Sequence, residues 1–231
     1  MSKKISIIIP TLNEALGLRP FLTELQALRS QCELIVVDGG SDDDTIMIAE
    51  EYVDDVVKTQ QGRAIQMNTG AAMASTPLLW FLHADSRLPD NAINAIDQAI
   101  HQGYQWGHFD IKLSGKSIWL SIIVWMMNRR ARWTGIATGD QALFVDKQLF
   151  EQLDGFADIS LMEDIELCSR LKNLSKPYCI QAKLITSSRR WIRFGIVKTV
   201  LLMWWLRLQF YYGVSPKKLE YLYRKGLFWS K

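Results

Sequence analysis

Short apolar runs that stop abruptly at polar residues recur along most of the chain. The clearest is residues 78–82, LLWFL, which is followed directly by the polar segment HADS at residues 83–86. A run that is apolar throughout and too short for a helix is typical of a strand buried on both faces of a parallel sheet. Similar runs predict further strands at residues 5–9, 33–37, 53–59, 106–113 and 142–145.

Between these runs, apolar residues recur three and four positions apart, the spacing of one face of a helix. This spacing, together with capping residues, predicts helices at residues 16–28, 45–52, 62 onward, 90–102, 147–153 and from about 163 onward. Strands that alternate with helices are typical of an α/β fold, here a mostly parallel sheet flanked by helices. In such sheets, ligands bind in the crevice outside the carboxyl ends of the strands.

Two further apolar segments have no strand pattern. Residues 118–127, IWLSIIVWMM, predict a ten-residue buried helix that stops at the polar residues 128–132, with an interfacial helix as the alternative. Residues 196–212 are apolar nearly all round, and aromatic and basic residues cluster there as at the headgroup level of a membrane. Both are shorter than the ~20 residues that span a bilayer. We therefore keep two interpretations of the second segment: attachment to an anionic membrane surface, and packing on the rest of the chain or in a dimer.

The charge is strongly asymmetric along the 231 residues. Residues 171–231 carry thirteen lysines and arginines against one acid, a net charge of +12, whereas residues 1–170 carry 14 against 23, a net charge of −9. This predicts a basic end that faces an anionic partner, for which the inner face of the cell membrane is one hypothesis. A nucleic-acid partner is not expected, because the carboxylates at the strand ends would repel it. Three widely spaced cysteines without a CxxC motif favour reduced thiols and a cytoplasmic location.

Polar residues follow several of the predicted strands and would converge at one edge of a parallel sheet. They are Thr11 and Glu14, Asp38, Asp85, and Glu163 with Asp164, joined by Arg63 at a helix start. Asp85 is a hard oxygen ligand that suits Mg²⁺ or Mn²⁺ carried in by a polyphosphate. The combination predicts a nucleotide-diphosphate site with a divalent cation and a separate carboxylate base. Neither GxGxxG nor GxxxxGK[ST] is present, so a dinucleotide dehydrogenase and a P-loop NTPase are not supported.

Each of these features also has a purely structural interpretation. Asp85 could cap the turn before Pro89, and the segment DGGSDDD at residues 38–44 could be a glycine-rich turn that caps the next helix. Arg63 could pair with the aspartates at 42–44. The two acids at 163 and 164 could simply favour a helix start through its dipole.

Six ordered motifs, IIPTLNE, VVDGGSDDDT, FLHADSRLP, GDQALFV, LMEDIEL and SSRRW, closely resemble those of the family 2 glycosyltransferases of GT-A fold, from residue 5 to about 191. GRAIQMNTGA with HADSRLP and LMEDIEL is similar to the bacterial subgroup named for arsenosugar biosynthesis. The resemblance implies an inverting transfer from a nucleotide-diphosphate sugar, with UDP favoured, to an acceptor hydroxyl. It places this domain at residues 1–190, followed by a helical extension at 191–231, whose composition suits a lipid-linked acceptor.

The resemblance also implies roles for individual residues. Asp164, with Glu163 beside it, would be catalytic, Asp164 as the general base, and Asp85 would bind the divalent cation, Mn²⁺ or Mg²⁺. The residues implied in binding the nucleotide sugar are Pro10, Thr11, Glu14, Asp38, Gly39, Arg63, Ala84, Asp85, Asp140, Arg189, Arg190 and Trp191.

Three positions depart from the family pattern. His83 replaces the first aspartate of DxD, Gly39 replaces the second aspartate of DDGS, and Ser187 stands where a glutamine often opens QxxRW. The first departure leaves the cation with one protein carboxylate.

Two other function classes fit the sequence less well than a glycosyltransferase does. A sugar-phosphate nucleotidyltransferase would need a glycine-rich phosphate loop near the amino terminus, which residues 10–14 do not provide. A non-enzymatic membrane-associated module that uses the basic end would leave the carboxylates at the strand ends unexplained.

Overall fold

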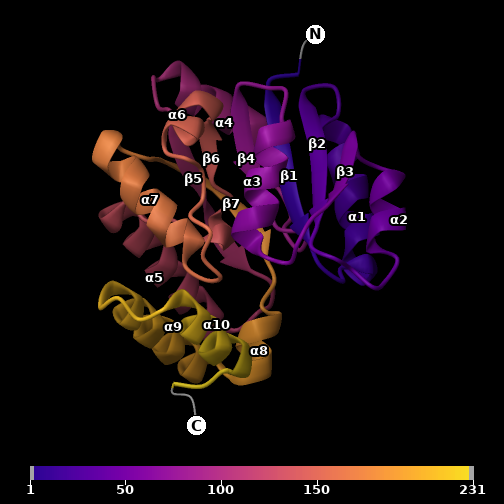
Figure 1. The fold of residues 1–231 in the computed structure, drawn as a ribbon. Helices are drawn as coiled ribbons and strands as arrows, with labels where there is room; N and C mark the ends of the chain where they lie inside the picture. Colours follow the sequence, from indigo (N-terminus) through magenta and orange to yellow (C-terminus); the bar gives the residue numbers. More distant parts are fainter. Residues whose placement is uncertain (1–2, 229–231) are drawn as a thin grey trace.

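A seven-stranded sheet runs through the computed structural model, which describes residues 3–228 (Figure 1). The sheet order is β3-β2-β1-β4-β6-β5-β7. The strands are β1 (Ile5–Thr11), β2 (Cys32–Asp38), β3 (Asp55–Lys58), β4 (Leu78–Phe81), β5 (Trp106–Leu113), β6 (Phe144–Asp146) and β7 (Tyr178–Thr186). The helices are α1 (Ala15–Leu25), α2 (Thr45–Glu50), α3 (Arg63–Met73), α4 (Ala92–His101), α5 (Ile118–Thr134), α6 (Lys147–Gln152), α7 (Glu163–Leu174), α8 (Arg189–Phe194), α9 (Ile196–Tyr211) and α10 (Pro216–Lys225), with 3-10 turns at Gln26–Leu28 and Gly139–Gln141. The predicted α/β fold is confirmed.

Strand direction decides what meets at the carboxyl edge of the sheet. Strands β3, β2, β1 and β4 are parallel, β6 runs antiparallel to both β4 and β5, and β7 is parallel to β5. The carboxyl ends of β1, β2, β4 and β7 therefore lie at one edge. Because β6 is reversed, the segment that precedes it, Gly139–Gln141, lies at that same edge.

The core has two apolar layers, one on each face of the sheet. In β4, Trp80 belongs to one layer and Phe81 to the other, and both are buried, as expected for a strand covered on both faces. Residues of α1, α2 and α4 contribute to the first layer, and residues of α3, α6 and α7 to the second. Helix α3 lies so close to β1 that a Cβ added at Gly70 would sit 2.5 Å from Ile8 Cγ2. The small residues of α3 make this approach possible.

Helix α5 differs from its prediction. The expected ten-residue buried helix with a stop at residues 128–132 is wrong, because α5 continues through these residues and ends before Gly135, which takes a left-handed conformation at φ 67°. Asn128 does not end the helix because its side chain both donates to and accepts from the backbone of Ile111 in β5. One face of α5 is buried, whereas Trp119 and Trp125 on the outer face are 61% and 60% exposed.

Strand β7 was not predicted, although its residues alternate. Ile180 and Leu184 are buried, whereas Gln181 and Lys183 are exposed. Its pairing with β5 shifts register at a bulge between Phe109 and Asp110. The strand adds a parallel edge whose carboxyl end leads directly into α8.

The three C-terminal helices lie beyond the carboxyl edge of the sheet (Figure 1). Leu202 and Leu206 of α9 pack with Leu219 and Leu222 of α10 and with Met162, which precedes α7. This small apolar cluster attaches the extension to the rest of the molecule. Within residues 3–228, no helix has the length and hydropathy needed to cross a membrane.

Candidate active site

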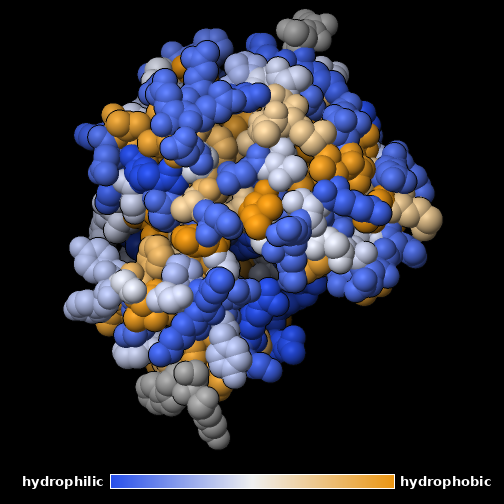
Figure 2. Space-filling model, viewed as in Figure 1, coloured by the Kyte–Doolittle hydropathy of each residue, from blue (hydrophilic) through white to orange (hydrophobic). Residues whose placement is uncertain are grey.

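A cavity of about 720 Å³ lies between the carboxyl edge of the sheet and the C-terminal helices. A hollow between these helices and the rest of the molecule is visible on one face, bordered largely by hydrophilic side chains (Figure 2). Nine of the predicted site residues line the cavity: Glu14, Arg63, Asp85, Asp140, Glu163, Asp164, Arg189, Arg190 and Trp191. Its volume is that of a typical small-molecule site. Predicted site residues as far apart in the sequence as Glu14 and Trp191, 177 positions, therefore line the same cavity.

The start of α7 fixes the Asp164 carboxylate. The backbone N–H of Gly139 donates to Asp164 Oδ2 at 2.6 Å, and the N–H of Ile165 donates to Oδ1 at 2.7 Å. Met162, immediately before the helix, has a left-handed backbone at φ 72°, which a bulky residue rarely adopts. The chain is thus held in a strained conformation at the point where two carboxylates enter the cavity.

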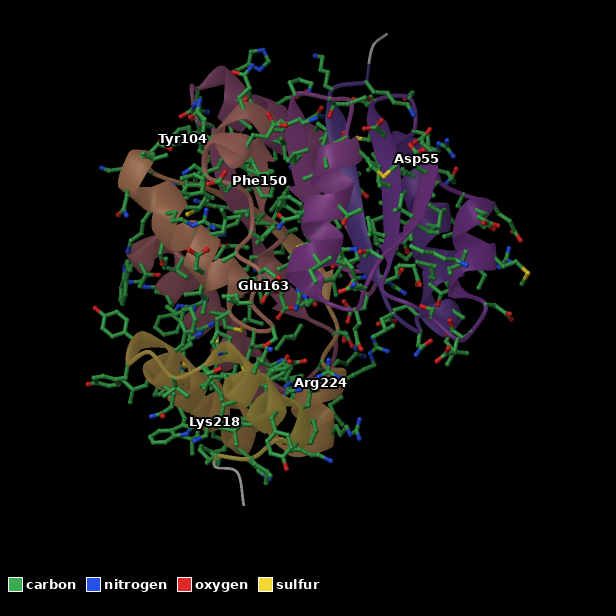
Figure 3. The ribbon with its side chains drawn as sticks, in the orientation of Figure 1. Asp55, Tyr104, Phe150, Glu163, Lys218 and Arg224 are labelled. Carbon is green, nitrogen blue, oxygen red and sulfur yellow. The ribbon has the colours of Figure 1, made fainter. Side chains whose placement is uncertain are left out.

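Glu163 and Arg63 form an ion pair across the cavity wall. Arg63 Nε lies 3.4 Å from Glu163 Oε1, and Glu163 is 4% exposed. Glu163 lies at the start of α7, between the sheet and the C-terminal helices that carry Lys218 and Arg224 (Figure 3). Burial raises the pKa of Glu163, the charge of Arg63 opposes this shift, and the adjacent carboxylate of Asp164 adds to it.

Arg63 does not form the salt bridge that its purely structural interpretation predicted. It pairs with Glu163, not with the aspartates at 42–44. Burial by itself would lower the pKa of Arg63, but the surrounding carboxylates, Glu163 first among them, raise it. The guanidinium also contacts the ring of His83, whose pKa burial and the charge of Arg63 hold well below its usual value. His83 is therefore a neutral imidazole near pH 7.

Asp85 extends into the cavity from the loop after β4. Its Oδ2 accepts from Arg189 Nη2 at 3.3 Å, and the same nitrogen lies 3.8 Å from Glu14 Oε2. This pairing does not match the capping role considered for Asp85. Asp140 faces it from the turn before β6, with His83 Nδ1 3.7 Å from Asp140 Oδ1. Burial raises the pKa of Asp140 against the opposing charge of Arg63.

Five predicted binding residues do not line the cavity: Pro10, Thr11, Asp38, Gly39 and Ala84. Asp38 is fully buried, and its carboxylate accepts from the backbone N–H groups of Gly40 at 2.9 Å and Ser41 at 2.7 Å, and from the Thr11 hydroxyl at 3.2 Å. It therefore shapes the loop after β2.

The end of β1 is fixed in a similar way. The Gln66 amide donates to the carbonyl oxygens of Thr11 and Val37, both at 2.8 Å, and so joins the ends of β1 and β2. These ends form a rigid polar border at the carboxyl edge of the sheet, the same edge on which the cavity lies.

Sequence reasoning did not select three cavity residues of the helices: Arg130 of α5, Arg207 of α9 and Tyr223 of α10. Arg190 Nη2 donates to the Tyr223 carbonyl oxygen at 2.5 Å, and its guanidinium lies 3.5 Å from the centre of the Tyr223 ring. The sequence feature that could have identified Arg207 is a charged residue within an otherwise apolar run. That signal does not tell which way the side chain points.

Comparisons with known proteins agree with this geometry. A model of the family described as glycosyl transferase family 2 matches residues 6–144. An uncharacterized glycosyltransferase of Mycobacterium tuberculosis is 28% identical over 192 residues, which cover 78% of this chain and 73% of that protein. A PGL/p-HBAD biosynthesis glycosyltransferase of Mycobacterium bovis is 40% identical over 93 residues, 36% of each chain. Assignment to the arsenosugar-type subgroup stays a prediction.

Solved structures show the same fold. Residues 1–349 of Staphylococcus aureus TarS, in complex with UDP, align with a TM-score of 0.66 and 18% identity, over 80% of this chain and 60% of that chain. Glucosyl-3-phosphoglycerate synthase of M. tuberculosis, with Mn²⁺ and UDP, aligns at 0.59 and 18%, over 80% and 71%. The mannosyltransferase PcManGT of Pyrobaculum calidifontis, with GDP-Man and Mn²⁺, aligns at 0.61 and 20%, over 80% and 57%.

The chain spans about 60% of the length of the TarS fragment. The likeness to TarS therefore supports the fold of this chain and does not extend to the activity of TarS as a whole. The family match covers more than half of the chain and includes the strands that carry Thr11 and Asp38 and the loop after β4 that carries Asp85. The fold is GT-A, and the chain belongs to glycosyl transferase family 2 and is a glycosyltransferase.

Proposed function

We propose that this enzyme transfers a sugar from a nucleotide-diphosphate donor, with UDP as the nucleotide, to an acceptor hydroxyl by a single displacement that inverts the anomeric carbon. The observation that carries this proposal is the shared cavity, which brings the carboxylates of Asp85 and Asp164 together with Arg63 and Arg189. The UDP complexes of TarS and of glucosyl-3-phosphoglycerate synthase support UDP, whereas PcManGT was solved with GDP-Man.

We assign the donor to the end of the cavity beside β1, β2 and β4. Glu14, Asp85 and Arg189 gather there, and Arg63 lies beside Asp140. The cations would face the diphosphate, while the border formed by Thr11, Asp38, Gly39, Pro10 and Ala84 would accommodate the nucleoside. Arg190 and Trp191 would close this end from α8. Charge of a departing diphosphate is stabilised by such pre-positioned cations.

The residues at this end are compatible with a divalent cation. The Asp85 carboxylate lines the cavity, and among residues 3–228 its hydrogen-bond partner is Arg189, at 3.3 Å. Within the part of the chain that the structure describes, no three acidic, histidine or cysteine side chains form a ready-made metal site. Mg²⁺ and Mn²⁺ fit such a sparse site because substrate phosphates and water complete their coordination. When bound, the cation would neutralise charge on the departing diphosphate.

We assign the general base to Asp164. Its carboxylate is held by two backbone N–H groups, and it lines the cavity, so it can accept the proton of an acceptor hydroxyl as that hydroxyl attacks the anomeric carbon. A positioned base contributes ~10²- to 10⁴-fold in rate. Glu163 is buried against Arg63, so we give it the role of positioning that cation. The diphosphate leaves from the opposite side of the carbon, which inverts its configuration.

The test is donor hydrolysis, in which water replaces the unidentified acceptor. UDP- and GDP-sugars are incubated with the enzyme and Mn²⁺ or Mg²⁺, and release of the free nucleotide is measured. We expect hydrolysis of a UDP-sugar, and NMR of the first sugar released should show the inverted anomer. Failure of every nucleotide sugar to bind or to be hydrolysed would contradict the proposed donor class, and a retained anomer would contradict the single displacement.

We further propose that residues 191–231 attach the catalytic domain, residues 1–190, to the inner face of the cell membrane. Exposed apolar side chains on α9 support this, with Val197, Leu201 and Trp204 67%, 48% and 54% exposed. The neighbouring α5 adds Trp119 and Trp125, 61% and 60% exposed. Aromatic residues beside lysine and arginine suit an anionic headgroup layer. Co-sedimentation with anionic and neutral liposomes tests it. Val197→Ser with Leu201→Ser on α9 should weaken binding, and a wild type that binds neither liposome contradicts attachment.

A further inference from the structure

Two arginines of the cavity have buried side-chain nitrogens that find no hydrogen-bond partner among residues 3–228. Arg130 projects from α5 and Arg207 from α9, and both line the cavity. Arg130 Nε and Nη2 and Arg207 Nε are buried, and none has a hydrogen-bond partner among residues 3–228. In contrast, Arg63 and Arg189, which line the same cavity, form ion pairs with Glu163 and Asp85.

Two half-buried guanidiniums that lie near each other are unfavourable, although the Asp164 carboxylate offsets part of this cost. A buried charge without a partner costs several kcal/mol, and like charges add to this cost. Burial, and then the charge of Arg207, lower the pKa of Arg130 to about 10. Burial likewise lowers the pKa of Arg207. Both side chains still carry a positive charge near pH 7, so an anion that enters between them would be strongly favoured.

The carboxylates near these arginines differ from those near the proposed donor residues. Asp164 acts electrostatically on both arginines. In contrast, Asp85 and Arg189 interact with Glu14 at the other end, and Asp140 lies between the two ends, within reach of Asp85 and of Arg207. These interactions place the arginine pair on the Asp164 side of the cavity and the proposed donor residues on the Glu14 side. An anion between Arg130 and Arg207 belongs to the acceptor side.

The walls beside the arginine pair are apolar and continue to the surface. They are formed by Ile123, Met126 and Met127 of α5 and by Val200, Met203 and Trp204 of α9. Trp204 both lines the cavity and is 54% exposed, so it connects the interior to the outer face of α9. On that face Val197, Leu201 and Leu208 are 67%, 48% and 48% exposed and follow the spacing of one helix stripe.

We propose that the acceptor is an anionic amphiphile whose phosphate binds between Arg130 and Arg207 and whose apolar chain leaves past Trp204. This rests on the proposed function, because it names the acceptor class of the same site. Two guanidiniums suit a phosphate better than a singly charged group, since each can donate two parallel hydrogen bonds to its oxygens. The phosphate would hold the acceptor hydroxyl next to Asp164.

The test measures the binding of n-octyl phosphate to the enzyme saturated with UDP, by calorimetry. We expect Arg130→Gln and Arg207→Gln each to weaken this binding at least about tenfold, because each removes charged hydrogen bonds. Arg129→Gln is the matched control: Arg129 is the neighbour of Arg130 on α5 but is exposed and stacks on Trp125 and Trp133, so the affinity should stay within about twofold.

Other ligands separate charge from apolar contact. n-Octanol, which has the chain but no charge, and inorganic phosphate, which has the charge but no chain, should each bind at least about tenfold more weakly than octyl phosphate. Octanol that binds as tightly would overturn the arginine assignment. Inorganic phosphate that binds as tightly would overturn the amphiphile. Unchanged octyl phosphate affinity in both Gln variants would overturn the proposal as a whole.

Folding and the donor site are checked in the same variants. Removing a half-buried cation from this pair should leave the melting temperature unchanged or raise it, and Arg207→Lys, which keeps the charge, should retain most of the octyl phosphate affinity. UDP affinity should stay within about twofold in all variants. Loss of UDP binding together with octyl phosphate binding would place the arginines in the donor site and overturn the acceptor assignment. If the wild type binds octyl phosphate but no nucleotide, the proposed donor fails independently.

Discussion

Replacing Asp164 by asparagine removes the proposed base with little change of shape. The wild-type carboxylate accepts hydrogen bonds from the N–H groups of Gly139 at 2.6 Å and Ile165 at 2.7 Å. Asparagine has one carbonyl oxygen, so it can retain the bond to Gly139 but turns its NH₂ group towards the N–H of Ile165. The lost bond should cost about 0.5–1.5 kcal/mol of stability. The variant therefore folds, and its activity can be interpreted.

The effect on rate should be much larger than the effect on stability. An asparagine cannot accept the proton, so the rate of donor hydrolysis should fall ~10²- to 10⁴-fold, the contribution of a positioned base. This corresponds to about 3–5 kcal/mol of transition-state stabilisation. UDP affinity should change little, because asparagine keeps the shape of Asp164 and we assign the diphosphate to Asp85, Arg63 and Arg189 and not to Asp164.

The assay pairs UDP calorimetry with release of UDP from a UDP-sugar. Glu166→Gln is the matched control, because Glu166 lies in the same first turn of α7 but pairs with Arg170, 2.7 Å from Nε, and does not line the cavity. Its activity should equal that of the wild type. An Asp164→Asn variant that hydrolyses the donor at the wild-type rate would refute the base assignment. If UDP affinity fell by the same factor as the rate, Asp164 would be a binding residue instead.

Three further predictions concern the metal, a buried acid and the packing of α3. Asp85→Ala should abolish the gain in UDP affinity that Mn²⁺ gives in calorimetry, and an undiminished gain would remove Asp85 from the metal site. Burial, opposed by the charge of Arg63, raises the pKa of Glu163 above its ordinary 4.5, so the folded protein binds this proton more tightly and that stability is lost as pH rises through the raised pKa. Thermal unfolding should therefore show Glu163→Gln gaining stability relative to the wild type as the pH rises above about 4.5, and a constant difference would contradict the shift. Gly70→Ala should cost about 1–3 kcal/mol in denaturant unfolding, because its Cβ would lie 2.5 Å from a side chain of β1. Gly17→Ala, which meets nothing within 4 Å, should stabilise the protein by about 0.5–1 kcal/mol, and equal effects at the two glycines would show that close packing is not the cause.

The sequence by itself determined the strands that carry the donor end of the site. The apolar runs of β1, β2 and β4 are continuous because both faces of these strands are buried, and such runs are visible without any tertiary information. Their polar ends identified Asp85, and the acids at the start of α7 identified Asp164. Since parallel neighbours share an edge, it was possible to predict that these distant carboxylates would converge.

Only the tertiary structure decided the direction of β6, the position of β7 and which residues of the helices line the cavity. A pattern of alternating side chains is the same in parallel and antiparallel strands, so the reversal that brings Asp140 beside His83 and within electrostatic reach of Asp85 is not encoded locally. Arg130 and Arg207 likewise interrupt apolar segments that could face lipid, a partner or the core. Only the crossing of α5 and α9 over the sheet edge turns both guanidiniums into the same cavity, because that orientation depends on packing between helices far apart in the chain.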